Sequence, residues 1–168
     1  IGPKTEARLW QAGIYAWPDF AAAAHLPVNP AKISQIRHEL ADSCRALEQR
    51  QSGYFSARLP SDQQWRLFPD FRDRTAYIDI ETTGMSRDFN RITTIALYDG
   101  VEIRHYVYGR NLDRFVEDLL GYDLLVTYNG KSFDLPFIER FFNIRLHHGH
   151  VDLRYVLKSL GYSGGLKG

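Results

Sequence analysis

The chain has one cysteine, no long apolar run and almost no net charge, and each shortage excludes a class of protein. Cys44 alone cannot form an internal disulfide, which fits a reducing compartment, so we expect a cytoplasmic protein. No apolar stretch approaches the ~20 residues that span a bilayer, and no basic-then-apolar leader opens the chain, so we expect no membrane partner. Residues 1–74 carry 10 basic and 8 acidic side chains, and residues 75–168 carry 11 and 12. The chain therefore lacks the strong positive field of a typical DNA-binding domain.

The 168 residues leave room for one α/β domain and a small helical region. Residues 1–52 predict a helical region that includes a long amphipathic helix over 31–50, because apolar residues recur there at steps of three and four. Residues 53–74 predict a connector, in which residues 65–68 either form a short strand or pack over the next block. Residues 75–168 predict the α/β domain.

This domain predicts the element order strand, strand, strand, helix, strand, helix, strand, helix. Asp99-Gly100 is a strong hairpin pattern between the second and third strands. Pro136 falls in the first turn of the second helix, a position that proline favours. The expected ranges after the first strand are 92–98, 101–108, 112–120 (helix), 124–128 and 151–153.

An apolar stretch at residues 75–78 leads into the segment 79–84, DIETTG, which ends in a glycine turn. Asp79 and Glu81 stand two residues apart, so on a strand both carboxylates point to the same face. Like charges this close repel each other unless a positive charge lies between them. A divalent cation is the simplest such partner, and oxygen ligands suit Mg²⁺ or Mn²⁺. The alternative is a capped or solvated carboxylate pair at a strand end.

A further acidic position lies in the segment 127–134, TYNGKSFD, where the predicted fourth strand runs into a helix. Asp134 stands at this strand-to-helix junction, where α/β sheets often gather ligand-binding residues. If the first and fourth strands are neighbours, Asp134 faces Asp79 and Glu81 across the end of the sheet. Three converging carboxylates would hold one or two hard cations, and two such ions about 3.5–4 Å apart catalyse phosphodiester cleavage.

Together the two segments resemble the first two motifs of the DEDD (DnaQ-like) 3′→5′ exonucleases, which have a ribonuclease-H-like fold. Residues 65–69 (WRLFP) and 164–167 (GGLK) resemble more narrowly the YprB-type branch of that superfamily, and the whole resemblance covers roughly residues 60–168. It implies an α/β fold with a mixed five-stranded sheet flanked by helices. It also implies hydrolysis of DNA or RNA from a 3′ end, with two Mg²⁺ or Mn²⁺ ions per complete site.

The resemblance implies roles for individual residues as well. Asp79, Glu81 and Asp134 would be the catalytic carboxylates and metal ligands. Other motif residues would contact the substrate, namely Thr82, Thr83, Gly84, Asn129 and Lys131. For Lys131, a phosphate contact and a solvated loop lysine are equally good interpretations.

The resemblance is incomplete at the C-terminal end. The superfamily needs a fourth carboxylate from a third motif on a later helix, and the sequence stops at Gly168, before that segment. We therefore expect a longer parent chain with other domains, and we expect this fragment to bind metal weakly and to have little activity or none. Asp152 is the only downstream candidate for a metal ligand, and a helix N-cap is the alternative.

Two other patterns in the sequence each have a functional and a plainer structural interpretation. His147, His148 and His150 suggest a zinc site, but four ligands are the norm and nothing nearby completes the set, so a polar loop is preferred. The opening residues 1–7, IGPKTEA, resemble the hairpin half of a helix-hairpin-helix motif. In that motif the hairpin and the next helix receive a DNA phosphate, which implies phosphate-binding roles for the following residues, with a helical packing module as the alternative. These residues are Gly2, Lys4 and Arg8.

The sequence thus predicts a metal-dependent 3′→5′ exonuclease. A non-catalytic nucleic-acid-binding module and an endonuclease of similar fold are the two alternatives. An acidic residue on a later helix would separate the first alternative from the exonuclease, and cleavage of circular DNA would separate the second.

Overall fold

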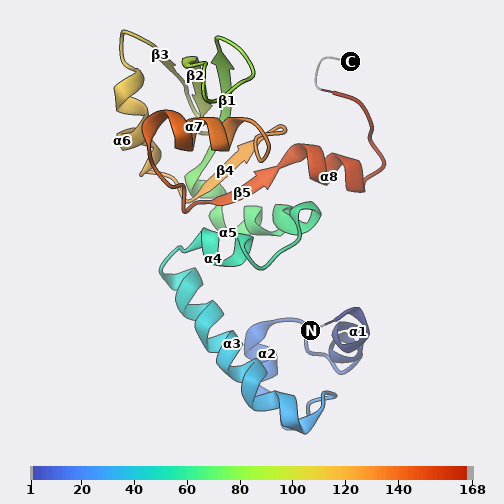
Figure 1. The fold of residues 1–168 in the computed structure, drawn as a ribbon. Coiled ribbons are helices and arrows are strands. Elements are labelled where there is room, and N and C mark those ends of the chain that lie inside the picture. Colours follow the sequence, from blue (N-terminus) through green and yellow to red (C-terminus); the bar gives the residue numbers. More distant parts are fainter. Residues whose placement is uncertain (1, 166–168) are drawn as a thin grey trace. The chain divides into compact units, whose positions relative to one another are not determined.

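The computed structural model describes residues 2–165, and the chain divides into two compact units, residues 1–49 and residues 50–168 (Figure 1). The segment 53–74, expected as a connector, belongs to the second unit. Within residues 2–165 no helix combines the length and apolarity needed to cross a membrane.

The first unit is a small group of helices around an apolar core. Each helix has a proline in its first turn, where the missing N–H of proline has no helical partner to lose. Leu9, Ile14 and Phe20 are buried together, and Ile36 and Leu40 pack against them. The long helix expected over 31–50 is the third of this unit, and Asn29 caps it through the Ala31 amide. The helices are α1 (Pro3–Gln11), α2 (Trp17–Ala22) and α3 (Pro30–Glu48).

The second unit is built on a five-stranded mixed sheet, which confirms the predicted fold class. The strand order is β3-β2-β1-β4-β5. β1 is antiparallel to β2, as β2 is to β3, whereas β1, β4 and β5 run parallel. The first and fourth strands are therefore neighbours, as the argument for Asp134 requires. The strands are β1 (Thr75–Thr82), β2 (Ile92–Tyr98), β3 (Ile103–Val107), β4 (Leu124–Thr127) and β5 (Gly149–Asp152).

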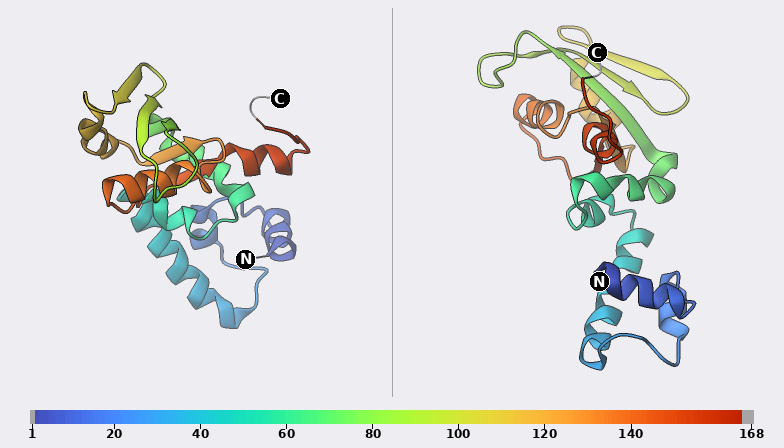
Figure 2. Two further views of the ribbon diagram at one scale, coloured as in Figure 1. Left: turned by 45° about the horizontal axis from the view of Figure 1, so that its top comes forward. Right: turned by 90° about the vertical axis from the view of Figure 1, so that its right-hand side faces the viewer.

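Helices flank this sheet, and α6 and α8 lie at its opposite edges (Figures 1 and 2). The helix expected over 112–120 is divided into a 3₁₀ turn and a short α-helix. The strand considered for residues 65–68 is wrong, because most of that segment lies in a 3₁₀ helix that buries Leu67. The helical elements are α4 (Ser52–Ser56), η1 (Ser61–Leu67), α5 (Phe68–Phe71), η2 (Arg72–Arg74), η3 (Leu112–Arg114), α6 (Phe115–Leu119), α7 (Asp134–Phe142) and α8 (Leu153–Ser159).

The main core lies between one face of the sheet and the helices α6 and α7. Ile78 and Ile80 of β1 are buried there with Phe115 of α6 and Phe137 of α7. Because side chains alternate along a strand, Asp79 and Glu81 point away from this core, and both are exposed. The register of β1 thus separates its apolar and acidic residues onto opposite faces.

Candidate active site

β1 is twice as long as its parallel neighbour β4, and this mismatch opens the edge of β1. β4 pairs with β1 only as far as Tyr77, which lies opposite Val126. The later residues of β1, including Asp79 and Glu81, therefore have no β4 partner beside them. A further irregularity in the pairing with β2 falls between Glu81 and Thr82. The acidic end of β1 is left accessible from the side of β4.

Asp134 fills the first part of this opening. Its Oδ1 accepts a hydrogen bond from the Ile80 amide at 3.2 Å, and Ile80 stands between the two acidic residues of β1. Asp134 is the first residue of α7, and only 4% of it is exposed. The structure therefore brings Asp134 to the Asp79/Glu81 segment.

The loop between β4 and α7 has the tight geometry that delivers Asp134. Asn129 has a left-handed backbone with φ 64°, a conformation that Asn tolerates better than most residues. Gly130 packs directly on the Thr127 side chain, and a Cβ at this position would collide with it. The Gly130 amide also donates to Thr127 Oγ1 at 3.1 Å. Asn129 thus provides the left-handed backbone conformation of this loop, and Gly130 allows its close approach to Thr127.

Asp152, at the end of β5, holds the same loop from the other side. Its Oδ1 accepts from the amides of Asn129 at 2.8 Å and Arg154 at 3.0 Å, and its Oδ2 accepts from the Lys131 amide at 3.0 Å. Asp152 is completely buried, and it is the N-cap of α8. These bonds make Asp152 the cap that the sequence offered as the alternative to a metal ligand.

The three predicted carboxylates line one cleft, which has a volume of about 760 Å³. We call it the carboxylate cleft. Asp79, Glu81 and Asp134 line it, whereas Asp152 does not. Its other lining residues are Ile80, Tyr128, Asn129, Phe133, Arg154, Gly164 and Gly165.

The charge of Asp134 is unfavourable in this cleft. Burial raises the pKa of Asp134 to about 6, and repulsion from Asp79 adds to the effect. The amides of Ile80 and of Asp134 itself lower the pKa, but they do not offset burial and repulsion. A carboxylate held in this way favours a proton or a cation as its partner.

The donor set fits a hard divalent cation. Its ligands would be carboxylate oxygens, the kind that Mg²⁺ and Mn²⁺ prefer, and a cation would relieve the repulsion between Asp79 and Asp134. Within residues 2–165, however, no three His, Cys, Asp or Glu side chains are grouped closely enough to form a metal site as they stand. Asp79 and Glu81 are exposed, so inward rotation of their side chains would have to complete the set.

Four of the expected substrate-binding residues lie outside the lining of the carboxylate cleft. Thr82 Oγ1 donates to the Gly84 carbonyl at 2.8 Å, and Thr83 Oγ1 donates to Asn90 Oδ1 at 3.0 Å. These hydroxyls shape the turn after β1. Lys131 Nζ donates to Ser61 Oγ at 2.5 Å. Asn129 does line the cleft.

Arg154 is the functional candidate that the sequence reasoning missed. It lies in the first turn of α8, and its Nη1 donates to Asn129 Oδ1 at 2.5 Å. No other basic residue lines the carboxylate cleft as far as residues 2–165 are concerned. Tyr128 and Phe133 were missed as well, although both lie within the second motif segment, residues 127–134. The position of Arg154, two residues after Asp152, was the available clue.

The three histidines do not share one environment. His150 lies in β5, where its Nε2 contacts Thr127 Oγ1 at 2.9 Å and burial lowers its pKa to about 4. His148 is half-buried, its Nε2 lies 3.3 Å from the Leu119 carbonyl, and burial lowers its pKa. The polar-loop interpretation is therefore wrong for His150. No zinc cluster forms among the histidines in the described part of the chain.

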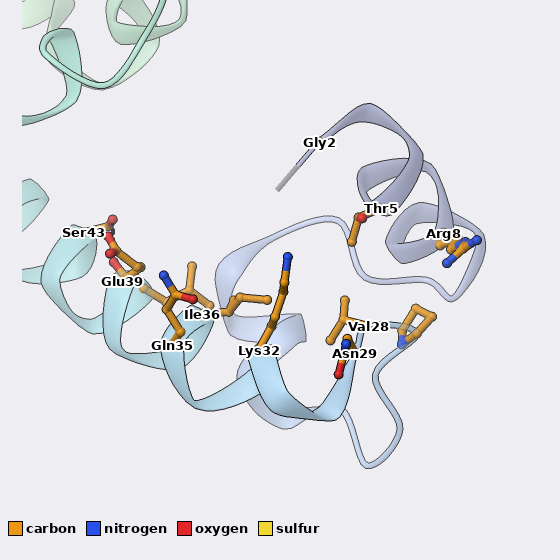
Figure 3. Close-up of a pocket in the computed structure, with 12 residues that line it drawn as sticks. Gly2, Thr5, Arg8, Val28, Asn29, Lys32, Gln35, Ile36, Glu39 and Ser43 are labelled. Carbon is orange, nitrogen blue, oxygen red and sulfur yellow. Dashed lines mark hydrogen bonds between the residues drawn. The ribbon is translucent and has the colours of Figure 1, made fainter.

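The predicted phosphate-binding residues of the first unit meet in part. Gly2 and Arg8 line a groove of about 700 Å³ between α1 and α3, with Lys32 on the α3 side (Figure 3). Lys4 is not among the residues that line this groove. Their role remains a prediction, as does the helix-hairpin-helix resemblance. Of the closing segment GGLK, Leu166 and Lys167 lie outside the described residues.

Known structures resemble the chain only distantly. A family B DNA polymerase from the archaeon Pyrobaculum calidifontis is 18% identical, with a TM-score of 0.38 over 50% of this chain and 16% of the polymerase. NrnC of Brucella melitensis with bound Mg²⁺ is also 18% identical, with a TM-score of 0.33 over 51% of this chain and 42% of NrnC. The chain thus spans less than half of either protein, and at these TM-scores the likeness carries no argument about function.

Sequence comparison is more specific. No curated protein matches the chain. The family model of the RNase_H superfamily matches residues 76–168, which is more than half of the 168 residues and includes every strand of the sheet except the first residue of β1. The chain therefore belongs to the RNase_H superfamily.

Proposed function

We propose that this chain carries the catalytic core of a Mg²⁺- or Mn²⁺-dependent 3′→5′ exonuclease that hydrolyses phosphodiester bonds of DNA or RNA. The observation that supports the proposal most strongly is the hydrogen bond from the Ile80 amide to Asp134. It ties a residue that follows β4 to the acidic end of β1, in a chain of the RNase_H superfamily.

The carboxylates would hold the metal ions. Asp134 is fixed by the Ile80 amide, whereas Asp79 and Glu81 project from β1 with exposed side chains. Bound divalent ions would activate a water molecule and stabilise the leaving oxygen of the phosphodiester. The rigid strand and the start of α7 would orient the carboxylates for this task.

The other lining residues would position the substrate. Arg154 has five N–H donors, and the bond to Asn129 uses one of them, so the guanidinium retains donors for a phosphate. A positive charge is needed here because a phosphodiester approaching three carboxylates is repelled. Phe133 and Tyr128 would pack against the sugar and base of the terminal nucleotide.

A nuclease assay on the full-length natural protein tests the proposal. With Mn²⁺, 5′-labelled linear strands of DNA or RNA should shorten progressively, 3′-labelled strands should release labelled mononucleotides, and covalently closed circles should stay intact. Asp79→Asn is the matched control, since it keeps the shape of the side chain and removes its charge.

Two outcomes would replace the proposal by its alternatives. If linear single- and double-stranded DNA and RNA all remain intact, the chain is a non-catalytic nucleic-acid-binding module or has another role. If circles are cut, the protein is an endonuclease.

A further inference from the structure

A second groove adjoins the carboxylate cleft on the α8 side. It measures about 470 Å³, and it shares Tyr128, Arg154, Gly164 and Gly165 with the carboxylate cleft. We call it the α8 groove. Each space falls in the range of about 300–1,000 Å³ that holds small organic ligands, so each can hold a unit the size of a nucleotide. Its remaining lining residues are Leu157, Lys158, Tyr162 and Ser163.

The charge of the α8 groove is opposite to that of the carboxylate cleft. Arg154 and Lys158 are four residues apart on α8, so both project from the same face of the helix. No acidic side chain lines the groove within the part of the chain that the structure describes. A phosphate backbone that the carboxylates repel would therefore find favourable contacts next to them.

Two tyrosines give the groove aromatic walls. Tyr128 is half-buried, and its hydroxyl donates to the Gly164 carbonyl at 3.0 Å. Tyr162 is 67% exposed, which leaves its ring available to a ligand. Cations combined with aromatic rings are the pattern that binds unpaired nucleotides, since any base can stack on a ring.

The backbone fixes this arrangement. Gly161 lies two residues after the end of α8 and has φ 88°. Its amide donates to the Lys158 carbonyl, and the Tyr162 amide donates to the Leu157 carbonyl at 3.0 Å. The chain therefore reverses direction at Gly161. The segment after this turn is held by the hydrogen bond from the Tyr128 hydroxyl to the Gly164 carbonyl. The backbone of Tyr162 is thus anchored to α8, and both Tyr162 and Lys158 line the groove.

We propose that the α8 groove binds the unpaired nucleotides adjacent to the cleaved linkage, with Lys158 on a phosphate and Tyr162 stacked on a base. The inference rests on the proposed function and makes single-stranded nucleic acid the substrate of this site. A duplex would leave no base free to stack on Tyr162.

Binding without cleavage tests the proposal. Fluorescence anisotropy in EDTA is measured with labelled 12-nucleotide oligo(dT) and oligo(U) and with a blunt hairpin duplex. The chain should bind a single strand at least fivefold more tightly than the duplex. Tyr162→Ala and Lys158→Glu should each weaken single-strand binding about fivefold or more. Because Lys158→Glu also removes a phosphate contact, the slope of log K against log salt concentration should become about 0.7 less steep in that variant.

Two matched variants control for general effects. Tyr162→Phe keeps the ring and should bind within twofold of the unmodified chain. Arg110→Glu makes the same charge change as Lys158→Glu on the turn after β3, at the opposite edge of the sheet, and should also bind within twofold. The proposal is overturned if the chain binds no single strand, if it prefers the duplex, or if Lys158→Glu and Tyr162→Ala bind as well as their controls.

A parallel assay separates this inference from the proposed function. Mn²⁺-dependent hydrolysis by the unmodified protein tests the carboxylate cleft, whereas binding in EDTA by the Lys158 and Tyr162 variants tests the α8 groove, which these two residues line. If cleavage is normal and the variants bind oligonucleotides as well as the unmodified chain, the proposed role of the α8 groove is wrong and the proposed nuclease function stands. If binding depends on the α8 groove but no cleavage is detected, the proposed nuclease function is wrong and the binding role of the groove stands.

Discussion

The end of β5 and the start of α7 each bury an aspartate, and the two carboxylates have opposite surroundings. Asp152 accepts hydrogen bonds from three backbone amides, whereas Asp134 is stabilised by the amides of Ile80 and of Asp134 itself and is repelled by Asp79. Buried carboxylates are stable when they are fully hydrogen-bonded and strained when a like charge is near. The difference indicates a structural role for Asp152 and supports the metal-ligand role that we propose for Asp134.

Removal of the Asp152 carboxylate should have the largest effect on stability. Asp152→Ala leaves three amides without their acceptor in a buried loop, so we expect a loss of roughly 3–5 kcal/mol in the free energy of unfolding. Urea denaturation in EDTA measures it. Asp152→Asn keeps one oxygen and should lose less. If Asp152→Ala were as stable as the unmodified chain but failed to bind Mn²⁺, Asp152 would be a metal ligand.

Asp134 should matter for activity instead. Asp134→Asn keeps an oxygen for the Ile80 amide and removes the charge, so the fold should persist. We expect nuclease activity of the full-length protein to fall at least about 100-fold, which corresponds to about 2.7 kcal/mol of transition-state stabilisation. Rates of nucleotide release and melting curves measure the two effects. A variant with full activity would remove Asp134 from the site.

Gly130 tests the loop that connects the two regions. A Cβ at this position would collide with the Thr127 side chain, so Gly130→Ala should destabilise the protein by about 1–3 kcal/mol. Thr127→Ala in the same chain makes room, and the double variant should therefore be less destabilised than the two single effects predict together. Strict additivity in urea denaturation would show that this contact is not the cause.

The pH dependence of stability should distinguish the Asp134 carboxyl from an ordinary one. Its folded pKa of about 6 lies above the unfolded value of 3.8, so its unfavourable effect is fully present above pH 6 and disappears below about pH 3.8. In EDTA, Asp134→Asn should be more stable than the unmodified chain by on the order of 1–3 kcal/mol at pH 7. Denaturation between pH 7 and pH 4 should show this advantage shrinking, and a constant difference would contradict the assignment.

Lys131 should give the smallest effect. Its ammonium is exposed and bonded to Ser61, outside the lining of the carboxylate cleft. Lys131→Met should therefore change the free energy of unfolding by less than about 1 kcal/mol. Nucleotide release should stay within threefold of the unmodified rate. A tenfold loss of nuclease activity would instead support the phosphate contact that the sequence analysis offers for Lys131.

Local patterns predicted much of this region. The alternation in β1 places Ile78 and Ile80 on the core and Asp79 and Glu81 on the other face, and alternation is visible in any sequence. The strand-to-helix junction likewise located Asp134. What local patterns could not predict depends on chain segments that are distant in sequence.

Three features of the site depend on such distant segments: the three amides bonded to Asp152, the exposed edge of β1 and the position of Arg154. Asp152 meets Asn129 and Lys131 only because β4 and β5 are neighbours. The helical form of residues 65–67 was missed for a similar reason, since Leu67 is buried by packing within the second unit. Tertiary packing overrides local propensity in such segments.

Mn²⁺ binding to this chain tests the central claim most directly. Isothermal titration should detect binding to the unmodified chain, and Asp79→Asn and Asp134→Asn should each weaken it at least tenfold, whereas Glu139→Gln, outside the cleft lining, should not. The account is contradicted if the unmodified chain binds no Mn²⁺, or if both cleft variants bind it as tightly as the unmodified chain does.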